Sequence, residues 1–190
     1  ANTLIMLAMA PMLSAIISFI FLKENPDQKT WVAITITTLA VIYIFYDALD
    51  AGDFLGNFLG LVAAMGLAVG ANIIRSAKKI SLVPSAMLGK LMVALIALLF
   101  VDQIKIEGND LIIVPLMCIM CVAIPFVLVT LAPRYITAAE VNLFFLLETI
   151  LGPIWVWLVI KEQPSFETIM GGSVIVATIA VHSILALKKK

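Results

Sequence analysis

The sequence predicts an all-α fold, that of a polytopic helical membrane protein with seven transmembrane helices. Hydrophobic residues make up 63% of its 190 positions, well above the roughly 45–50% of a soluble domain. The charged residues gather between apolar runs of about 20 residues, the length that a helix needs to cross the hydrocarbon core of a bilayer. No polar stretch is long enough for a soluble domain, and the sequence lacks the short alternating strands of a transmembrane β-barrel.

Seven apolar runs follow one another along the chain, each bounded by a short polar segment. The first ends at KENPDQK, the third at RSAKK, and the fourth at DQIKIEGND, the most polar connection. The fifth run contains Pro115 and Pro125, which membrane helices tolerate because neighbouring groups satisfy the freed carbonyls. The predicted helices span residues 3–22, 31–46, 54–74, 84–101, 111–131, 138–162 and 166–187.

The basic residues alternate from one connection to the next and so predict the orientation. Two lysines lie on one side, whereas most of the others share the opposite side with the end of the chain. The basic side consists of Lys23, Lys29, Arg75, Lys78, Lys79, Arg134, Lys188, Lys189 and Lys190. The positive-inside rule makes that side cytoplasmic. We therefore expect a multi-pass protein of the cell inner (plasma) membrane with a cytoplasmic C-terminus.

The sixth run, AAEVNLFFLLETILGPIWVWLVIKE, holds the best candidate site in the sequence. At about 1.5 Å per residue, Glu148 lies roughly 15 Å into this helix, near the bilayer midplane. A carboxylate at that depth is costly unless it is protonated, paired or facing water. Pro153 follows Gly152 and has no N–H group, so the carbonyl of Thr149 loses its helical partner. We expect Glu148, Thr149 and Pro153 to belong to a substrate-binding site; the alternative is that Glu148 only packs against another helix.

Four further residues are candidates for lining the same cavity. Trp155 follows the Gly–Pro pair closely, although it could instead belong to an aromatic belt at the membrane interface. Pro125 frees a carbonyl near the middle of the fifth run, which is a weak indication because prolines are common in membrane helices. Pro11 and Ser14 lie in the first run.

Small residues in the third run predict close helix packing. Glycines separated by three positions let two membrane helices approach each other closely. We favour packing within the chain, with homodimerisation as the alternative. The pairs are Gly56 with Gly60 and Gly66 with Gly70.

Other chemistry-bearing residues have structural explanations that we prefer. His182 lies near the end of the last run, where we expect an interfacial or packing role rather than a proton relay. Glu140 should matter less for transport than Glu148, because it lies close to the membrane interface, where a charged group costs little free energy. Cys118 and Cys121 lie inside an apolar run without further ligands, so we expect no metal site.

The chain contains a repeat with an offset of 138 residues. The turn KENP begins at Lys23 and the turn KEQP begins at Lys161 (161 − 23 = 138), and an apolar run lies on both sides of each turn. The charge rule places the two turns on opposite sides of the membrane. The repeat is therefore predicted to be inverted, as in many secondary transporters.

The residues around these turns resemble a known family. The segments are AMAPMLSAIISFIFLKE (8–24), TAAEVNLFFLLETILGPIWVWLVIKEQPS (137–165) and GGSVIVATIAV (171–181). They are similar to the EamA-type branch of the drug/metabolite transporter superfamily, whose members contain two five-helix inverted repeats. Thr149 departs from the pattern, because a proline is common there. The positions that match are Pro11, Glu24, Glu140, Glu148, Pro153, Glu162, Pro164 and Gly171.

The resemblance implies a ten-helix transporter with a 5+5 inverted repeat, of which this chain looks like helices four to ten. Residues 1–50 would then hold the last two helices of the first repeat, and residues 51–190 the five helices of the second. On this interpretation the chain is a fragment, and three more helices are expected ahead of residue 1.

We expect the protein to be a secondary transporter that moves a small metabolite by alternating access, with efflux favoured. Its expected partners are that metabolite, the lipid bilayer and protons, with no nucleic acid, cofactor or metal. No P-loop is present to suggest ATP as the energy source. One alternative is a membrane-embedded enzyme acting on a lipid or prenyl group, which would need several Asp, His or Ser residues at one depth. The other is an accessory subunit that does not transport.

Overall fold

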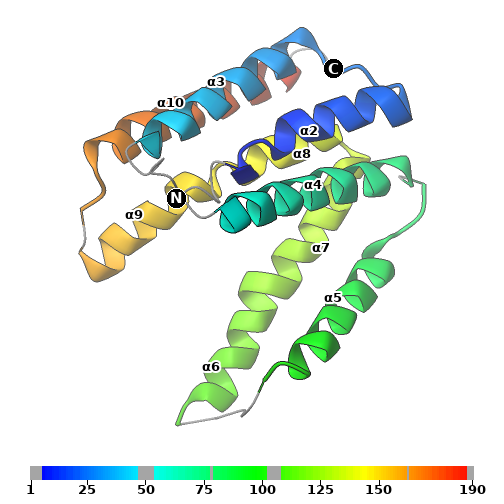
Figure 1. Ribbon diagram of the computed structural model, residues 1–190, viewed down its shortest axis with the longest axis vertical. Coiled ribbons are helices and arrows are strands. Elements are labelled where there is room, and N and C mark those ends of the chain that lie inside the picture. The colour runs from blue at the N-terminus through cyan, green and yellow to red at the C-terminus, as the bar shows by residue number, and fades with distance from the viewer. Residues whose placement is uncertain (1–5, 47–53, 78, 102–107, 162, 188–190) are drawn as a thin grey trace. The chain divides into compact units, whose positions relative to one another are not determined.

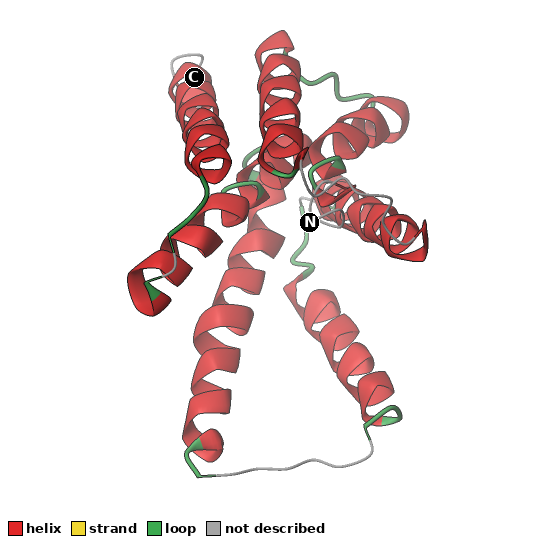
Figure 2. Ribbon diagram, turned by 60° about the vertical axis from the view of Figure 1, so that its left-hand side comes forward, coloured by secondary structure: helices red, strands yellow, loops and turns green. Residues whose placement is uncertain are grey.

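The computed structural model describes residues 6–46, 54–77, 79–101, 108–161 and 163–187, and these ranges are helical with short connections and no strand (Figures 1 and 2). The chain divides into two compact units. The first combines Ala1–Ile73 with Ile136–Lys190, and the second is Ile74–Tyr135. These units reflect packing, and the predicted repeat boundary at residues 50 and 51 lies outside the described residues.

Four helices are long and apolar enough to cross a membrane, and three shorter apolar helices accompany them in the described residues. The seven correspond one to one to the seven predicted runs, so the prediction of an all-α membrane protein is confirmed. The longer helices are Leu55–Ser76, Asp110–Arg134, Ala138–Ile160 and Phe166–Ala186. The shorter ones are Ala10–Leu22, Gln28–Ile44 and Val83–Leu98.

The first unit contains two helical hairpins and most of α4 (Phe54–Ser76). In the first hairpin, α2 (Ala10–Ile17) continues into the π-helical η1 (Ser18–Leu22), and a turn leads into α3 (Gln28–Ile44). Helix α3 begins three residues before the predicted start at residue 31. The reason is Asp27, whose side chain accepts a hydrogen bond from the Gln28 N–H group at 2.9 Å and caps the helix.

The second hairpin consists of α8 (Ala138–Phe145), α9 (Glu148–Ile160) and α10 (Phe166–Leu187). The predicted helix over residues 138–162 is divided, and the break lies at Leu146 and Leu147 rather than at Gly152–Pro153. Both leucine N–H groups bond to carbonyls three residues back, at 3.1 Å, which tightens the turn. Pro153 lies inside α9. The interruption therefore falls directly before Glu148.

The two hairpins pack against each other in opposite directions. Helix α3 lies beside α10 and α2 lies beside α8, and the turns of the two hairpins are at opposite ends of this unit (Figure 1). Thr30, near the start of α3, contacts His182 near the end of α10. Gly171, near the start of α10, approaches Ile44 at the end of α3. These contacts make α3 and α10 antiparallel.

Equivalent positions of the 138-residue repeat have equivalent conformations. Lys23 (φ 54°) and Lys161 (φ 65°) are the non-glycine residues with left-handed backbone in the described part of the chain. Helices α3 and α10 begin at residues 28 and 166, again 138 positions apart (166 − 28). Four buried positions of α3 coincide with four buried positions of α10. They are Ala33, Ile34, Thr37 and Val41 with Gly171, Gly172, Ile175 and Ile179.

The second unit is built on one long interrupted helix that α5 (Val83–Leu98) packs against. It consists of α6 (Asp110–Met117), the π-helical η3 (Cys118–Ala123), α7 (Ile124–Leu131) and the short η4 (Ala132–Arg134). The π-helical segment ends where α7 begins, and Pro125 lies in the first turn of α7. The Ile124 N–H group bonds to the Ile119 carbonyl five residues back. The Lys90 ammonium lies 4.2 Å from the centre of the Phe126 ring, a cation–π contact.

Candidate functional site

The first unit buries several polar side chains between otherwise apolar helices. Burying a polar group without a hydrogen bond costs free energy. Such residues therefore mark either a contact that stabilises helix packing or a functional site. Two direct contacts join different helices: one between α2 and α4, and one among α3, α8 and α10. The buried polar residues are Ser14, Ser18, Thr30, Thr37, Asn72, Asn142 and His182.

Asn72 of α4 joins its helix to α2. Its Nδ2 donates to the Ser14 hydroxyl at 2.9 Å, to the Ser14 carbonyl at 3.1 Å and to the Ala68 carbonyl at 2.8 Å. Two of these acceptors are carbonyls, which can only accept, so the orientation of the amide is well defined. The contact holds Ser14, which is fully buried, against α4.

His182 of α10 is placed between α3 and α8. Its Nε2 lies 3.1 Å from the Thr30 hydroxyl and 3.7 Å from a carboxylate oxygen of Glu140. The histidine is 6% exposed and the Glu140 side chain 16%. The same nitrogen thus faces one neutral and one acidic group. This nitrogen can accept from the threonine hydroxyl when it carries no proton, or donate to either oxygen when it carries one.

Glu140 is also fixed at the start of α8. Its carboxylate accepts from the Thr137 N–H group at 2.8 Å and from the Thr137 hydroxyl at 2.9 Å. The Glu140 N–H group donates back to the Thr137 hydroxyl at 3.3 Å. This is a capping box, which satisfies backbone donors at a helix N-terminus. Glu140 therefore helps to cap the start of α8 and also contacts His182 of α10.

Some buried acceptors in this unit have no hydrogen-bond partner among the described residues. They include the side-chain oxygens of Asn72, Asn142 and Ser18. The Nδ2 of Asn142 donates to the Ala138 carbonyl at 3.1 Å, which turns its oxygen the other way. An unpaired buried acceptor is satisfied when water or a ligand donates to it.

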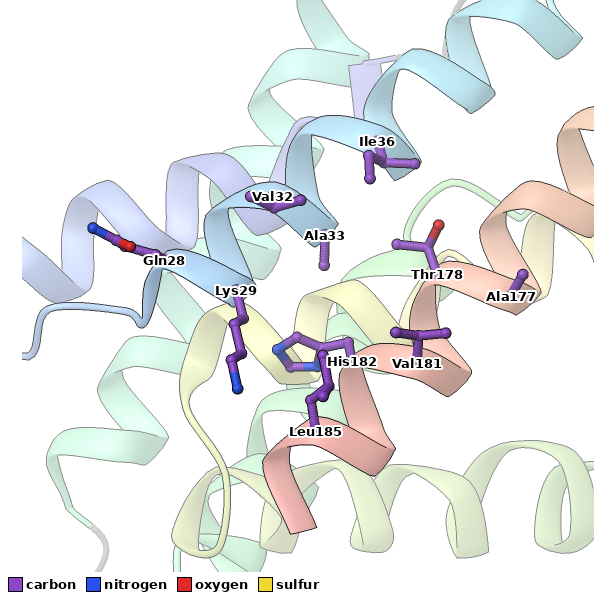
Figure 3. A pocket seen from close by; sticks show the side chains of 10 residues that line it. All are labelled: Gln28, Lys29, Val32, Ala33, Ile36, Ala177, Thr178, Val181, His182 and Leu185. Atoms are coloured by element: carbon purple, nitrogen blue, oxygen red, sulfur yellow. The ribbon is translucent and has the colours of Figure 1, made fainter. Parts of the chain in front are cut away.

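A groove of about 530 Å³ lies between α3 and α10 (Figure 3). Its volume is in the range of small-molecule and cofactor sites. Most of its wall is apolar, with Lys29 and Gln28 at one end and His182 beside them. Its lining residues are Gln28, Lys29, Val32, Ala33, Ile36, Ala177, Thr178, Val181, His182 and Leu185.

The structure places the predicted site residues in different surroundings. Pro11 and Ser14 share one face of α2 and are fully buried. Glu148 and Thr149 are in the first turn of α9, where Glu148 is exposed and Thr149 half-buried. The remaining positions are Pro153, half-buried in α9, Trp155, 63% exposed in α9, and Pro125, exposed in the second unit.

The sequence reasoning did not anticipate the Glu140–His182 contact or the burial of Asn142. The sequence does contain one indication of the contact between Glu140 and His182. Glu140 is near the start of the sixth run and His182 is near the end of the seventh. Antiparallel neighbours bring such positions to the same end. Nothing in the sequence distinguishes Asn142 from a polar residue that faces outward.

Comparison with known proteins identifies the family. The family model described as the EamA-like transporter family matches residues 54–184, more than half of the chain. Comparisons with curated proteins and with solved structures gave no match. The matched range runs from α4 into α10, and the helical architecture agrees with it. The chain is a multi-pass membrane protein that belongs to the EamA-like transporter family of the drug/metabolite transporter superfamily.

Proposed function

We propose that this protein is a secondary transporter that moves a small metabolite across the plasma membrane by alternating access, with export the favoured direction. Family membership supports transport. The observation that carries the mechanism is the antiparallel packing of two hairpins whose turns, helix starts and buried positions are related by one offset. Inverted repeats of this kind let two halves exchange conformations and open a site to each side in turn.

The proposal assigns residues 1–50 to the end of a first repeat and residues 51–190 to a second. It also retains homodimerisation as the alternative role of the glycines in α4. Gly56, Gly66 and Gly70 have open space where a Cβ would be: apart from neighbouring residues and the adjacent backbone of α4, no atom of the described residues lies within 4 Å of that position. Those faces of α4 can therefore accept a further helix, whether from the same chain or from a second copy.

Glu148 is the proposed site of proton exchange. It opens α9 directly after the interruption at Leu146 and Leu147, and the positive end of a helix dipole stabilises a carboxylate in the first turn. Its exposure lets it meet water when the cavity opens. Thr149, Pro153 and Trp155 extend this lining along α9, while Pro11 and Ser14 contribute from α2. The unpaired oxygens of Asn72 and Asn142 add acceptors for a substrate N–H or O–H group.

The test of the function is substrate flux. The full-length protein would be reconstituted in proteoliposomes with an imposed pH gradient, and a panel of labelled amino acids and other small metabolites would be followed. We expect saturable flux of at least one compound, and loss of its accumulation when a protonophore collapses the gradient. Failure to move any compound under a proton, sodium or substrate gradient would contradict secondary transport and favour an accessory role.

The test of the site is the substitution Glu148→Gln. Glutamine keeps the size and hydrogen-bonding capacity of glutamate but cannot titrate, so insertion should be normal while the pH dependence of transport is lost. Glu167→Gln is a matched control because Glu167 occupies the first turn of the neighbouring helix α10. We also expect Glu140→Gln to keep most of the transport. An unchanged pH profile in Glu148→Gln would make that acid a packing residue.

A further inference from the structure

We propose that the groove between α3 and α10 binds an anionic phospholipid, with its headgroup at Lys29 and one acyl chain along the apolar wall. The site is separate from the Glu148 region and does not depend on what the protein transports. The argument rests on the wall of the groove, its depth, and the charge at its end.

The apolar wall of the groove is open on its outer side. Val32 is 58% exposed, Ile36 is 38% exposed and Val181 is 56% exposed, and all three belong to membrane helices. In a bilayer such side chains contact hydrocarbon chains. A groove between them is therefore filled by lipid unless another protein covers it.

The length of the groove matches one leaflet. Its lining residues on α3 run from Gln28 to Ile36, which is about 12 Å along a helix at 1.5 Å per residue. One leaflet contributes roughly 15 Å of a hydrocarbon core about 30 Å thick. Gln28 is the first residue of α3, so the polar end of the groove is at headgroup level and its inner end is near the midplane. An acyl chain of that leaflet can therefore lie in this groove while keeping its normal depth in the bilayer.

The charge at the polar end selects the headgroup. Lys29 is exposed and extends from α3 toward His182 and Leu185 of α10 (Figure 3). It forms no ion pair with any residue that the structure describes. A lysine at the membrane surface attracts anionic lipids, and its aliphatic stem can lie along the groove while its ammonium stays at the interface.

The interior of the groove does not suit a polar metabolite. The Thr178 hydroxyl donates to the Val174 carbonyl of its own helix at 2.7 Å. The Nε2 of His182 already faces Thr30 and Glu140. A substrate rich in hydrogen-bonding groups would find few partners there, whereas an acyl chain needs none. The groove is accordingly assigned to lipid rather than to the transported compound.

The experiment is native mass spectrometry of the full chain titrated with phosphatidylglycerol and, separately, with phosphatidylcholine. We expect tighter binding of phosphatidylglycerol to the unmodified chain. Ala177→Trp fills the groove from α10 and should abolish this preference. The matched control is Ala180→Trp, since Ala180 is also exposed on α10 but does not line the groove.

A second pair of variants avoids any effect on packing. Lys29→Gln removes the headgroup charge and should weaken phosphatidylglycerol binding about fivefold, the effect of one surface lysine. Lys23→Gln removes a charge outside the groove and should change little. Equal affinity for both lipids, or unchanged binding in both Ala177→Trp and Lys29→Gln, would overturn the proposal. So would displacement of the lipid by dimerisation, or a preference for free oleate over phosphatidylglycerol.

Discussion

The imidazole of His182 on α10 lies 3.7 Å from the carboxylate of Glu140 on α8, and Thr30 on α3 shares the same ring nitrogen at 3.1 Å. Three helices therefore meet at one buried polar point. Because α3 belongs to the first hairpin and α8 and α10 to the second, this point joins the two hairpins. From the sequence we expect an interfacial or packing role for His182, and the structure gives this residue contacts with Thr30 and Glu140.

The Glu140–His182 contact should appear as a coupling energy. Glu140→Gln and His182→Ala would be combined in a double-mutant cycle, and the free energy of unfolding would be measured in detergent micelles. Residues in direct contact couple by about 0.5–3 kcal/mol, and we expect a value in that range.

The control for this cycle combines Glu140→Gln with Ser183→Ala. The Ser183 hydroxyl donates to the Ile179 carbonyl of its own helix at 2.7 Å, so the two changes should be additive. A coupling energy near zero for Glu140 and His182 would show that the two side chains are neighbours without a stabilising interaction.

The left-handed turns at Lys23 and Lys161 should respond alike to glycine. A left-handed residue with a Cβ costs about 1–2 kcal/mol that glycine avoids, partly offset by the greater chain entropy of glycine. Lys23→Gly and Lys161→Gly should each raise the free energy of unfolding by about 0.5–1 kcal/mol.

Lys79→Gly serves as the control, because Lys79 lies in the turn before α5 and is not left-handed. It should bring no gain. Stabilisation at only one of Lys23 and Lys161 would contradict the equivalence of the two turns.

Gly171 should be the least replaceable glycine of α10. A Cβ there would overlap Ile44 Cγ1 and lie 3.1 Å from the Ala40 carbonyl oxygen of α3. Gly171→Ala should therefore destabilise the protein by about 1–3 kcal/mol, the usual cost of overpacking. Thermal unfolding in micelles would measure the loss.

Gly70→Ala and Gly152→Ala are matched controls. Apart from neighbouring residues and the adjacent backbone of the same helix, no described atom lies within 4 Å of the added methyl group. Both should be neutral or stabilising by up to about 1 kcal/mol. Adding Ile44→Ala to Gly171→Ala should recover part of the loss. No difference between Gly171 and Gly152 would mean that α3 and α10 are farther apart than described.

The orientation predicted from the basic residues can be tested with single cysteines at Lys29 and at Asp50. Cys118 and Cys121 would be removed first, since both are exposed. On intact cells an impermeant thiol reagent should label position 50 and not position 29, because the positive-inside rule places Lys29 in the cytoplasm. Permeabilised cells should show both sites labelled. The reverse pattern on intact cells would overturn the orientation and with it the cytoplasmic C-terminus.

Some properties of this protein follow from the sequence alone, because they depend on composition and local geometry. Long apolar runs must form helices in a bilayer, where every backbone group needs a partner. The two Lys-Glu-x-Pro segments end one helix and precede the next for local reasons, since proline is disfavoured in the interior of a helix and favoured near its start. Their shared offset therefore predicted the positions of both turns. Asp27 is a local signal as well, because its side chain caps α3 and places the start of that helix at Gln28.

The tertiary structure alone decided which faces of the helices meet. In a soluble protein the apolar stripe marks the buried face, but these helices are apolar all round because lipid is as apolar as a protein core. The pattern therefore could not show that His182 meets Glu140, that Gly171 lies against α3, or that α3 and α10 leave a groove between them. Those contacts depend on shape and on a few hydrogen bonds between residues that are distant in the sequence, and only packing brings them together.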